Sequence, residues 1–308
     1  YMVVKAGSET VVHRGNKART EYSIRRLAEE GRDAKESGRG IAIVYSGSCA
    51  MGRILRNKRG DTIGYDTLEE RKRDAQVGEP VIKDMIYRLS KEAGEEPVFV
   101  DVKPEDFLLP DGKRKIAEIL SNMSRGRTPW VNEKDAEREQ ESYGHSETFN
   151  ENDGLSSLVA MVINGHAPTS LGILMDRRGF LPKMYFVNRE SYKGPEDLYV
   201  IRIVVDPAGL ETQLVTDQAY SRERITRGGP LTKVMALSRA ARSGVPSFAG
   251  SGMFPMHDSN HMRTEGRMPK RHRPVLSMLD GRFGTFFVPS TQELYPEVSA
   301  ERLAVVAV

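Results

Sequence analysis

The sequence is poor in cysteine and in long apolar runs. A single cysteine, Cys49, rules out a disulfide within the chain and favours a reducing compartment. No apolar run approaches the roughly 20 residues that a membrane-spanning helix needs. The first residues show no apolar core of the kind that signal peptides carry. We therefore predict a cytoplasmic protein with no membrane partner.

An excess of charge of one sign is also lacking. Lysine and arginine number 46 and aspartate and glutamate number 43, which gives a formal net charge of +3. A basic stretch at 263–273 contains no aromatic residue that could stack on bases, so a solvated loop is the favoured interpretation. His257 and His261 have helical spacing, but the surrounding glycines and prolines argue against a helix. We predict no nucleic-acid partner and no metal site made by side chains.

What is present is an alternation of apolar strands and amphipathic helices. Hydrophobic residues make up 38% of the chain, enough for a substantial core. The predicted strands are 2–5, 40–45, 97–102, 129–131 and 170–175, and the predicted helices are 21–36, 69–93, 116–123 and 154–164. Strands that are apolar on both faces and alternate with helices imply an α/β fold. We expect a three-layer αβα sandwich with a mainly parallel central sheet.

Small, polar and charged residues follow several of these strands. The segments are 5–8 (Lys-Ala-Gly-Ser), 46–48 (Ser-Gly-Ser), 132–135 (Asn-Glu-Lys-Asp) and 176–179 (Asp-Arg-Arg-Gly). In open parallel sheets, ligands bind outside the carboxyl ends of the strands. The sequence therefore predicts a ligand site where these segments converge.

Taken singly, these motifs are weak. The first segment could cradle phosphate with backbone N–H groups and a lysine charge, but an ordinary turn with an exposed lysine is the favoured interpretation of this motif alone. Neither a Walker A sequence nor a Gly-x-Gly-x-x-Gly pattern follows the first strand. Residues 132–135 are echoed by Asn-Glu-Asn-Asp at 150–153. The similarity of the two segments is compatible with a metal-binding repeat, with a surface loop, or with two segments that contribute to one site.

The order of the motifs is more specific than any one of them. The blocks are VVKAGS at 3–8, IVYSGSCAMGR at 43–53, PWVNEKD at 129–135, NDGLSSLVA at 152–160, GGPLTK at 228–233 with AARSGV at 240–245, and GTFF at 284–287. In this order they resemble the amino-acid kinase superfamily, and within it the glutamate 5-kinases and the kinase domain of pyrroline-carboxylate synthases. The resemblance implies a kinase domain over residues 1–290 and a tail over 291–308, without the additional C-terminal PUA domain of some members.

The resemblance also implies an activity: ATP-dependent phosphorylation of the γ-carboxylate of glutamate, the first step of proline biosynthesis, with Mg²⁺. Lys5 and Lys233 would be catalytic, because they supply positive charge to the transferring phosphoryl group. The implied nucleotide-binding residues are Lys5, Gly7, Ser8, Asp176, Gly228, Gly229 and Lys233. The implied substrate-binding residues are Ser46, Gly47, Asp135, Asn152 and Asp153. A homo-oligomer, a dimer or tetramer, is expected on the same ground.

The sequence departs from the family pattern at several of these positions. Glu9 stands where Ser or Thr is usual, Lys134 replaces an Asn, Arg227 replaces a Gly and Pro230 replaces a Met. Two alternatives therefore stay open. One is a kinase of the same superfamily with a different carboxylate, a carbamate or a nucleotide as acceptor. The other is a catalytically weak relative that binds a nucleotide or amino acid for regulation.

Overall fold

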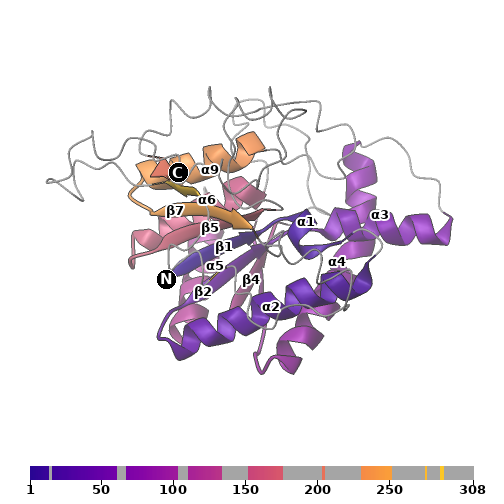
Figure 1. Cartoon of the computed structure of the whole chain (residues 1–308), viewed down its shortest axis with the longest axis horizontal. Coiled ribbons are helices and arrows are strands. Elements are labelled where there is room, and N and C mark those ends of the chain that lie inside the picture. Colours follow the sequence, from indigo (N-terminus) through magenta and orange to yellow (C-terminus); the bar gives the residue numbers. More distant parts are fainter. Residues whose placement is uncertain are drawn as a thin grey trace, which may run out of the picture.

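One mainly parallel sheet organises the protein (Figure 1). The computed structural model describes residues 1–13, 16–60, 67–102, 110–133, 152–175, 203–204, 230–251, 275 and 285–287. Within these ranges eight strands pair in the order β3-β4-β2-β1-β5-β7-β8-β6. Their bounds are β1 (Met2–Ala6), β2 (Ile41–Tyr45), β3 (Val98–Asp101), β4 (Pro129–Asn132), β5 (Ser170–Met175), β6 (Ile203–Val204), β7 (Ser247–Ser251) and β8 (Thr285–Phe287).

β1 lies in the middle of the sheet and fixes the register of its neighbours. Lys5 pairs with Val44 of β2 on one side and with Ile173 of β5 on the other, both in parallel. β3, β4 and β7 extend the parallel sheet, whereas β8 pairs with β7 antiparallel. The predicted α/β class with a mainly parallel sheet is confirmed.

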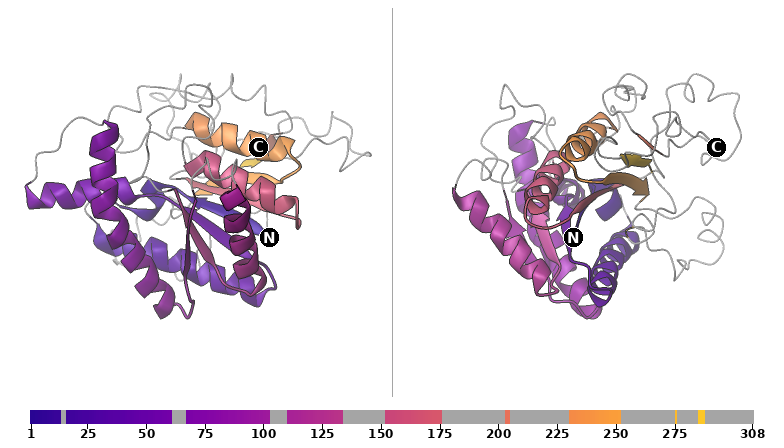
Figure 2. Two further views of the ribbon diagram at one scale, coloured as in Figure 1. Left: turned by 180° about the vertical axis from the view of Figure 1, so that it is seen from behind. Right: turned by 90° about the vertical axis from the view of Figure 1, so that its left-hand side faces the viewer.

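Helices cover both faces of this sheet, which makes the three predicted layers (Figure 2). Their bounds are α1 (Ser8–Val11), α2 (Lys17–Glu36), α3 (Ser48–Arg59), α4 (Leu68–Glu92), α5 (Pro110–Ser124), α6 (Asn152–Asn164) and α9 (Pro230–Arg242). Side chains along β1 alternate between the faces. Val3 packs with residues of α5, α6 and α9, whereas Met2, Val4 and Ala6 pack with residues of α2 and α4.

Local capping explains where two predicted helices begin. Asn16 accepts a hydrogen bond from the backbone N–H of Arg19, so α2 begins before the first apolar residue of its buried face. Thr67 caps α4 in the same way by accepting from the N–H of Glu70. The sequence prediction missed α3, because Ser46-Gly47-Ser48 was interpreted as a turn with no helix after it. α3 ends at Gly60, whose φ of 77° is left-handed.

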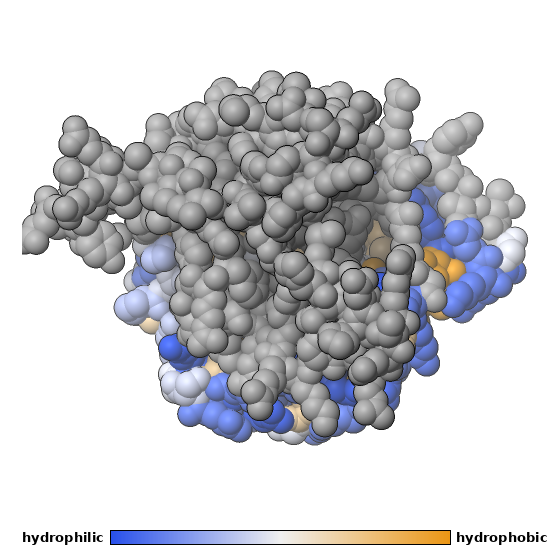
Figure 3. Space-filling model, viewed as in Figure 1, coloured by the Kyte–Doolittle hydropathy of each residue, from blue (hydrophilic) through white to orange (hydrophobic). Residues whose placement is uncertain are grey.

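The part of the chain that the structure describes contains no helix long and apolar enough to cross a membrane. Mostly hydrophilic residues cover the lower and right-hand parts of the face in Figure 3, where α2, α3 and α4 lie. The exposed faces of these helices are therefore mainly polar, although Val81 and Tyr87 of α4 are exposed apolar residues.

Candidate active site

The carboxyl ends of β1, β2 and β4 meet the first turns of α6 and α9. This junction brings together two lysines and one aspartate that are distant in the sequence. Lys5 comes from β1, Asp153 from the first turn of α6, and Lys233 from the first turn of α9. All three were predicted site residues, and the structure places them in direct contact.

Lys5 is almost completely buried at the end of β1. Its side chain is 7% exposed, and its Nζ lies 2.5 Å from Oδ1 of Asp153. Gly7 leaves room for this lysine: a Cβ at Gly7 would lie 3.3 Å from Nζ of Lys5. The glycine after β1 therefore permits the lysine to fold back over the strand end.

Asp153 receives its other contacts from α9. Its Oδ2 lies 3.3 Å from Nζ of Lys233 and accepts a hydrogen bond of 3.0 Å from Oγ1 of Thr232. An acidic residue in the first turn of a helix is also favoured by the helix dipole. One carboxylate thus bridges two ammonium groups carried by different elements.

The positive charges next to Asp153 lower the pKa of its carboxyl group. Burial raises the pKa of the Asp153 carboxyl, but the positive charges of Lys233 and Lys5 and the hydrogen bonds from Lys5 and Thr232 outweigh it. The net effect holds the pKa of Asp153 well below its usual range. Asp153 is therefore ionised at neutral pH, and the cluster of Lys5, Asp153 and Lys233 has one net positive charge.

The β2–α3 turn, which we define as Ser46–Ser48, lies next to the loop after β1. The N–H of Ser46 donates to the carbonyl of Ala6 at 3.1 Å, and Oγ of Ser8 donates to Oγ of Ser46 at 3.4 Å. Gly47 has a φ of 125°, and a Cβ there would lie 2.8 Å from Cγ2 of Val12. Only glycine fits this turn, both by its backbone conformation and by its space.

The end of β4 connects the end of β2 with α6. Nδ2 of Asn132 donates to the carbonyl of Tyr45 at 3.2 Å, and the N–H of Glu133 donates to Oδ1 of Asn152 at 3.4 Å. Oδ1 of Asn132 and Oγ of Ser48 are buried and have no hydrogen-bond partner among the described residues.

The structure describes most of the predicted site residues. Lys5, Gly7, Ser8, Ser46, Gly47, Asn152, Asp153 and Lys233 all lie at the carboxyl edge of the sheet or in the helix turns that meet it. Asp135, Asp176, Gly228 and Gly229 lie outside the described residues, as do Lys134 and Arg227 and the tail at 291–308.

Sequence reasoning missed three residues of this junction. Thr232 precedes Lys233 in the quoted GGPLTK block, and its position beside the lysine was the available signal. Asn132 and Glu133 belong to the quoted Asn-Glu-Lys-Asp segment, but only its aspartate was assigned. The described residues include no group of three or more His, Cys, Asp or Glu side chains placed to hold a metal ion.

Comparison with known proteins agrees with this fold. The family model described as the amino acid kinase family matches residues 1–180, and the chain belongs to this family.

Among curated proteins, the chain is 26% identical to the glutamate 5-kinase of Trichlorobacter lovleyi and 28% identical to that of Cupriavidus metallidurans. Each match covers 82% of this chain and 62% of the relative, so the chain spans less than two thirds of these relatives' length.

Solved structures of other kinases share the fold. The isopentenyl phosphate kinase of T. acidophilum superposes with a TM-score of 0.51 at 14% identity, over 93% of this chain and 99% of that one. The carbamate kinase of Giardia lamblia superposes with a TM-score of 0.53 at 13% identity, over 93% of this chain and 97% of that one. At such low identity the likeness concerns the fold alone.

Proposed function

We propose that this chain catalyses ATP-dependent phosphorylation of the γ-carboxylate of glutamate, the reaction that would begin proline synthesis. The observation that carries the proposal is the Lys5–Asp153–Lys233 cluster at the carboxyl edge of the sheet. The names of the curated relatives support the choice of glutamate as acceptor.

The residue types fit transfer of a phosphoryl group to a carboxylate. A carboxylate acceptor is already ionised at neutral pH and needs no general base. Catalysis then depends on alignment and on neutralising the charge of the transferring group. Lys5 and Lys233 supply two ammonium groups at one point, one from β1 and one from α9.

In this proposal Asp153 organises the two lysines. Two ammonium groups held close together repel each other, and the carboxylate between them offsets this repulsion. A lysine ammonium is a compact charge on a flexible stem and can exchange one anionic partner for another. The nucleotide phosphates would accept hydrogen bonds from the two ammonium groups.

The other predicted residues divide between the two substrates. Gly7 and Ser8 would face the nucleotide together with Asp176, Gly228 and Gly229. The β2–α3 turn and Asn152 would face glutamate together with Asp135. Asp153 was predicted to bind substrate as well, and its two lysine contacts give it the organising role in addition.

Mg²⁺ is assigned to the nucleotide and not to side chains. Mg²⁺ prefers hard oxygen ligands in octahedral geometry and is commonly held by substrate phosphates with few protein ligands. Both oxygens of Asp153 are engaged by Lys5, Thr232 and Lys233. A cytoplasmic homo-oligomer remains part of the proposal.

The test is a turnover assay with glutamate and ATP, in which hydroxylamine traps an acyl phosphate as the hydroxamate. We expect hydroxamate that depends on both substrates and on Lys233. A matched panel would replace glutamate with carbamate, isopentenyl phosphate or a nucleoside monophosphate. ATP consumption with one of these and none with glutamate would overturn the choice of acceptor. Nucleotide binding without any turnover would indicate a regulatory protein instead.

A further inference from the structure

α3 differs from the other helices in how it is attached to the protein. It begins at Ser48, directly after Gly47, and crosses α4 at the side of the sheet before running outward (Figure 1). Its buried residues are Ser48, Ala50, Gly52 and Arg56, and none of them is a large apolar residue. The larger apolar contacts of α3 with the core come instead from Met51 and Ile54, which are only partly buried.

Two glycines let the backbones of α3 and α4 touch. A Cβ at Gly52 would lie 1.7 Å from the carbonyl oxygen of Asp74. A Cβ at Gly78 would lie 1.9 Å from the carbonyl oxygen of Ser48. Contacts this close require glycine, and they bring α4 against the first residue of α3.

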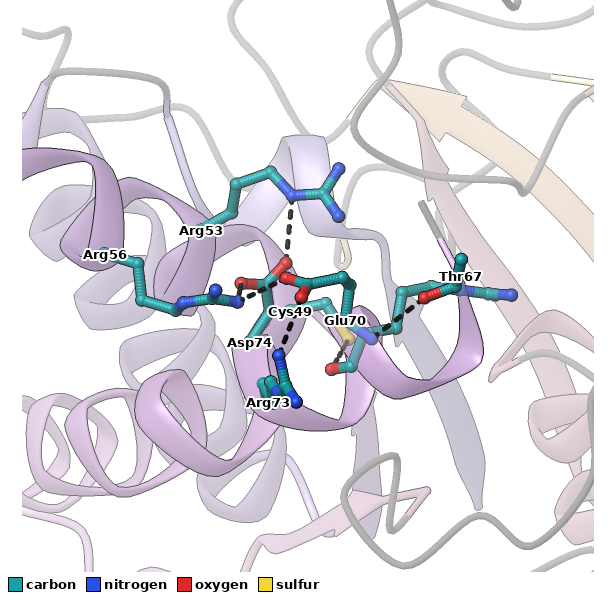
Figure 4. A network of polar contacts seen from close by, with 8 residues as sticks. Cys49, Arg53, Arg56, Thr67, Glu70, Arg73 and Asp74 are labelled. Atoms are coloured by element: carbon teal, nitrogen blue, oxygen red, sulfur yellow. Dashed lines mark hydrogen bonds and ion pairs between the residues drawn. The ribbon is translucent and has the colours of Figure 1, made fainter. Parts of the chain in front are cut away.

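A buried charge network holds the same crossing together (Figure 4). Asp74 of α4 is completely buried, and its carboxylate accepts from Nε of Arg53 at 2.9 Å and from Arg56 at 2.8 Å. Arg56 also contacts Glu70 at 2.9 Å, and Glu70 contacts the exposed Arg73 at 3.0 Å. Asp74 thus joins two arginines of α3, Arg53 and Arg56, to α4, and Glu70 gives Arg56 a second contact there.

We propose that Asp74 is a positioning residue for the β2–α3 turn and, through it, for the acceptor of the reaction. A helix transmits a displacement along its axis, so loosening the Asp74 contacts displaces Ser48 and the turn before it. Ser46 and Gly47 lie beside the loop that follows Lys5, whereas Asp74 itself touches neither substrate. The proposal rests on the proposed function, since it assigns this turn to the acceptor.

The experiment compares Asp74→Asn with Arg53→Leu and with Arg73→Ala as the matched control. Arg53→Leu leaves the contact between Asp74 and Arg56 in place, so it provides a second test if Asp74→Asn does not fold. Arg73→Ala removes an exposed member of the same network, whose side chain is 65% exposed. Steady-state constants for glutamate and for ATP are measured on each variant, together with amide hydrogen exchange in the ligand-free protein.

We expect Asp74→Asn to raise the KM for glutamate by about tenfold or more, because small displacements of a binding group weaken alignment. The KM for ATP should change by less than about twofold, since the Lys5–Asp153–Lys233 cluster is untouched. Exchange at residues 48–52 should become faster, with β1 and α6 unchanged. Arg53→Leu should act in the same direction with a smaller effect, and Arg73→Ala should match the original protein.

Equal changes in both KM values, or unchanged exchange at residues 48–52 in both variants, would overturn the proposal. If the original chain turns over no glutamate, the proposed function fails and hydrogen exchange decides the positioning role. Faster exchange confined to residues 48–52 then supports that role, and unchanged exchange there overturns it.

Discussion

Two buried carboxylates in this protein each lie between two cations, and the choice of cation differs. Asp153 bridges Lys5 and Lys233 at the carboxyl edge of the sheet, whereas Asp74 bridges Arg53 and Arg56 between α3 and α4. A lysine ammonium can change its anionic partner easily, but an arginine guanidinium holds a carboxylate in a fixed planar geometry. The lysine cluster therefore suits a site that must accept phosphates, and the arginine cluster suits a joint that must not move.

The arginine cluster should be the more costly one to break. Asp74→Asn removes the buried negative charge that contacts Arg53 and Arg56, and we expect the free energy of unfolding to fall by about 3–5 kcal/mol. Urea denaturation followed by circular dichroism measures this change. The control Arg73→Ala removes an exposed pair and should cost less than about 1 kcal/mol. If both variants lost the same unfolding free energy, the buried contacts of Asp74 would contribute no more to stability than the exposed contact of Arg73.

The lysine cluster should show its effect mainly in turnover. Lys233→Ala removes a charge that stabilises the transferring phosphoryl group, and we expect kcat to fall by about a hundredfold or more. The hydroxamate assay measures this loss. Lys17→Ala is the matched control, because Lys17 is 81% exposed and pairs with Glu21. An unchanged rate in Lys233→Ala would remove this lysine from the catalytic group.

Backbone contact at the arginine cluster can be tested separately from charge. Gly52→Ala would force a methyl group into the carbonyl of Asp74, and we expect a loss of roughly 1–3 kcal/mol in unfolding free energy. Gly165→Ala is a suitable control, since the nearest atom to a Cβ there is the carbonyl oxygen of Val162 at 3.3 Å. Thermal unfolding of both variants provides the comparison. A Gly52→Ala protein as stable as the control would show that the helices can separate without cost.

The smallest predicted effect concerns the pH dependence of the free energy of unfolding, to which Asp153 contributes. Its pKa is lowered in the folded protein, so its contribution to stability is fully present above the unfolded pKa of about 3.9. This contribution is lost as pH falls towards the folded pKa, with a slope of at most about 1.4 kcal/mol per pH unit. The free energies of unfolding of the original protein and of Asp153→Asn should therefore converge as the pH falls below about 4. If the two curves of unfolding free energy against pH stayed parallel down to pH 2, the lowered pKa of Asp153 would be contradicted.

Much of the fold could be predicted from local patterns. The five predicted strands and four predicted helices all occur, with boundaries moved by a few residues where Asn16 and Thr67 cap their helices. Apolar strands that alternate with amphipathic helices leave few arrangements other than a covered parallel sheet. β7 was missed because its sequence, Ser-Phe-Ala-Gly-Ser, has few large apolar residues.

The site was predicted in part, for a physical reason. Residues that follow strands of one parallel sheet must lie at one edge, so Lys5, Ser46 and Gly47 were expected near each other. Nothing in the sequence says that Asp153 contacts both lysines, since that depends on how α6 and α9 pack against β1. Asp74 could not be found either, because a carboxylate in a charged helix is ordinarily solvated.

The sequence by itself determined the class of fold, the edge where the site lies and the residue types that lie there. Hydrophobic periodicity and strand-end polarity are local properties, and each is encoded within a few consecutive residues. The tertiary structure alone decided the partners of the buried charges: Asp153 with Lys5 and Lys233, and Asp74 with Arg53 and Arg56. These pairs join different elements, and only packing brings such elements within the distance at which charges form contacts.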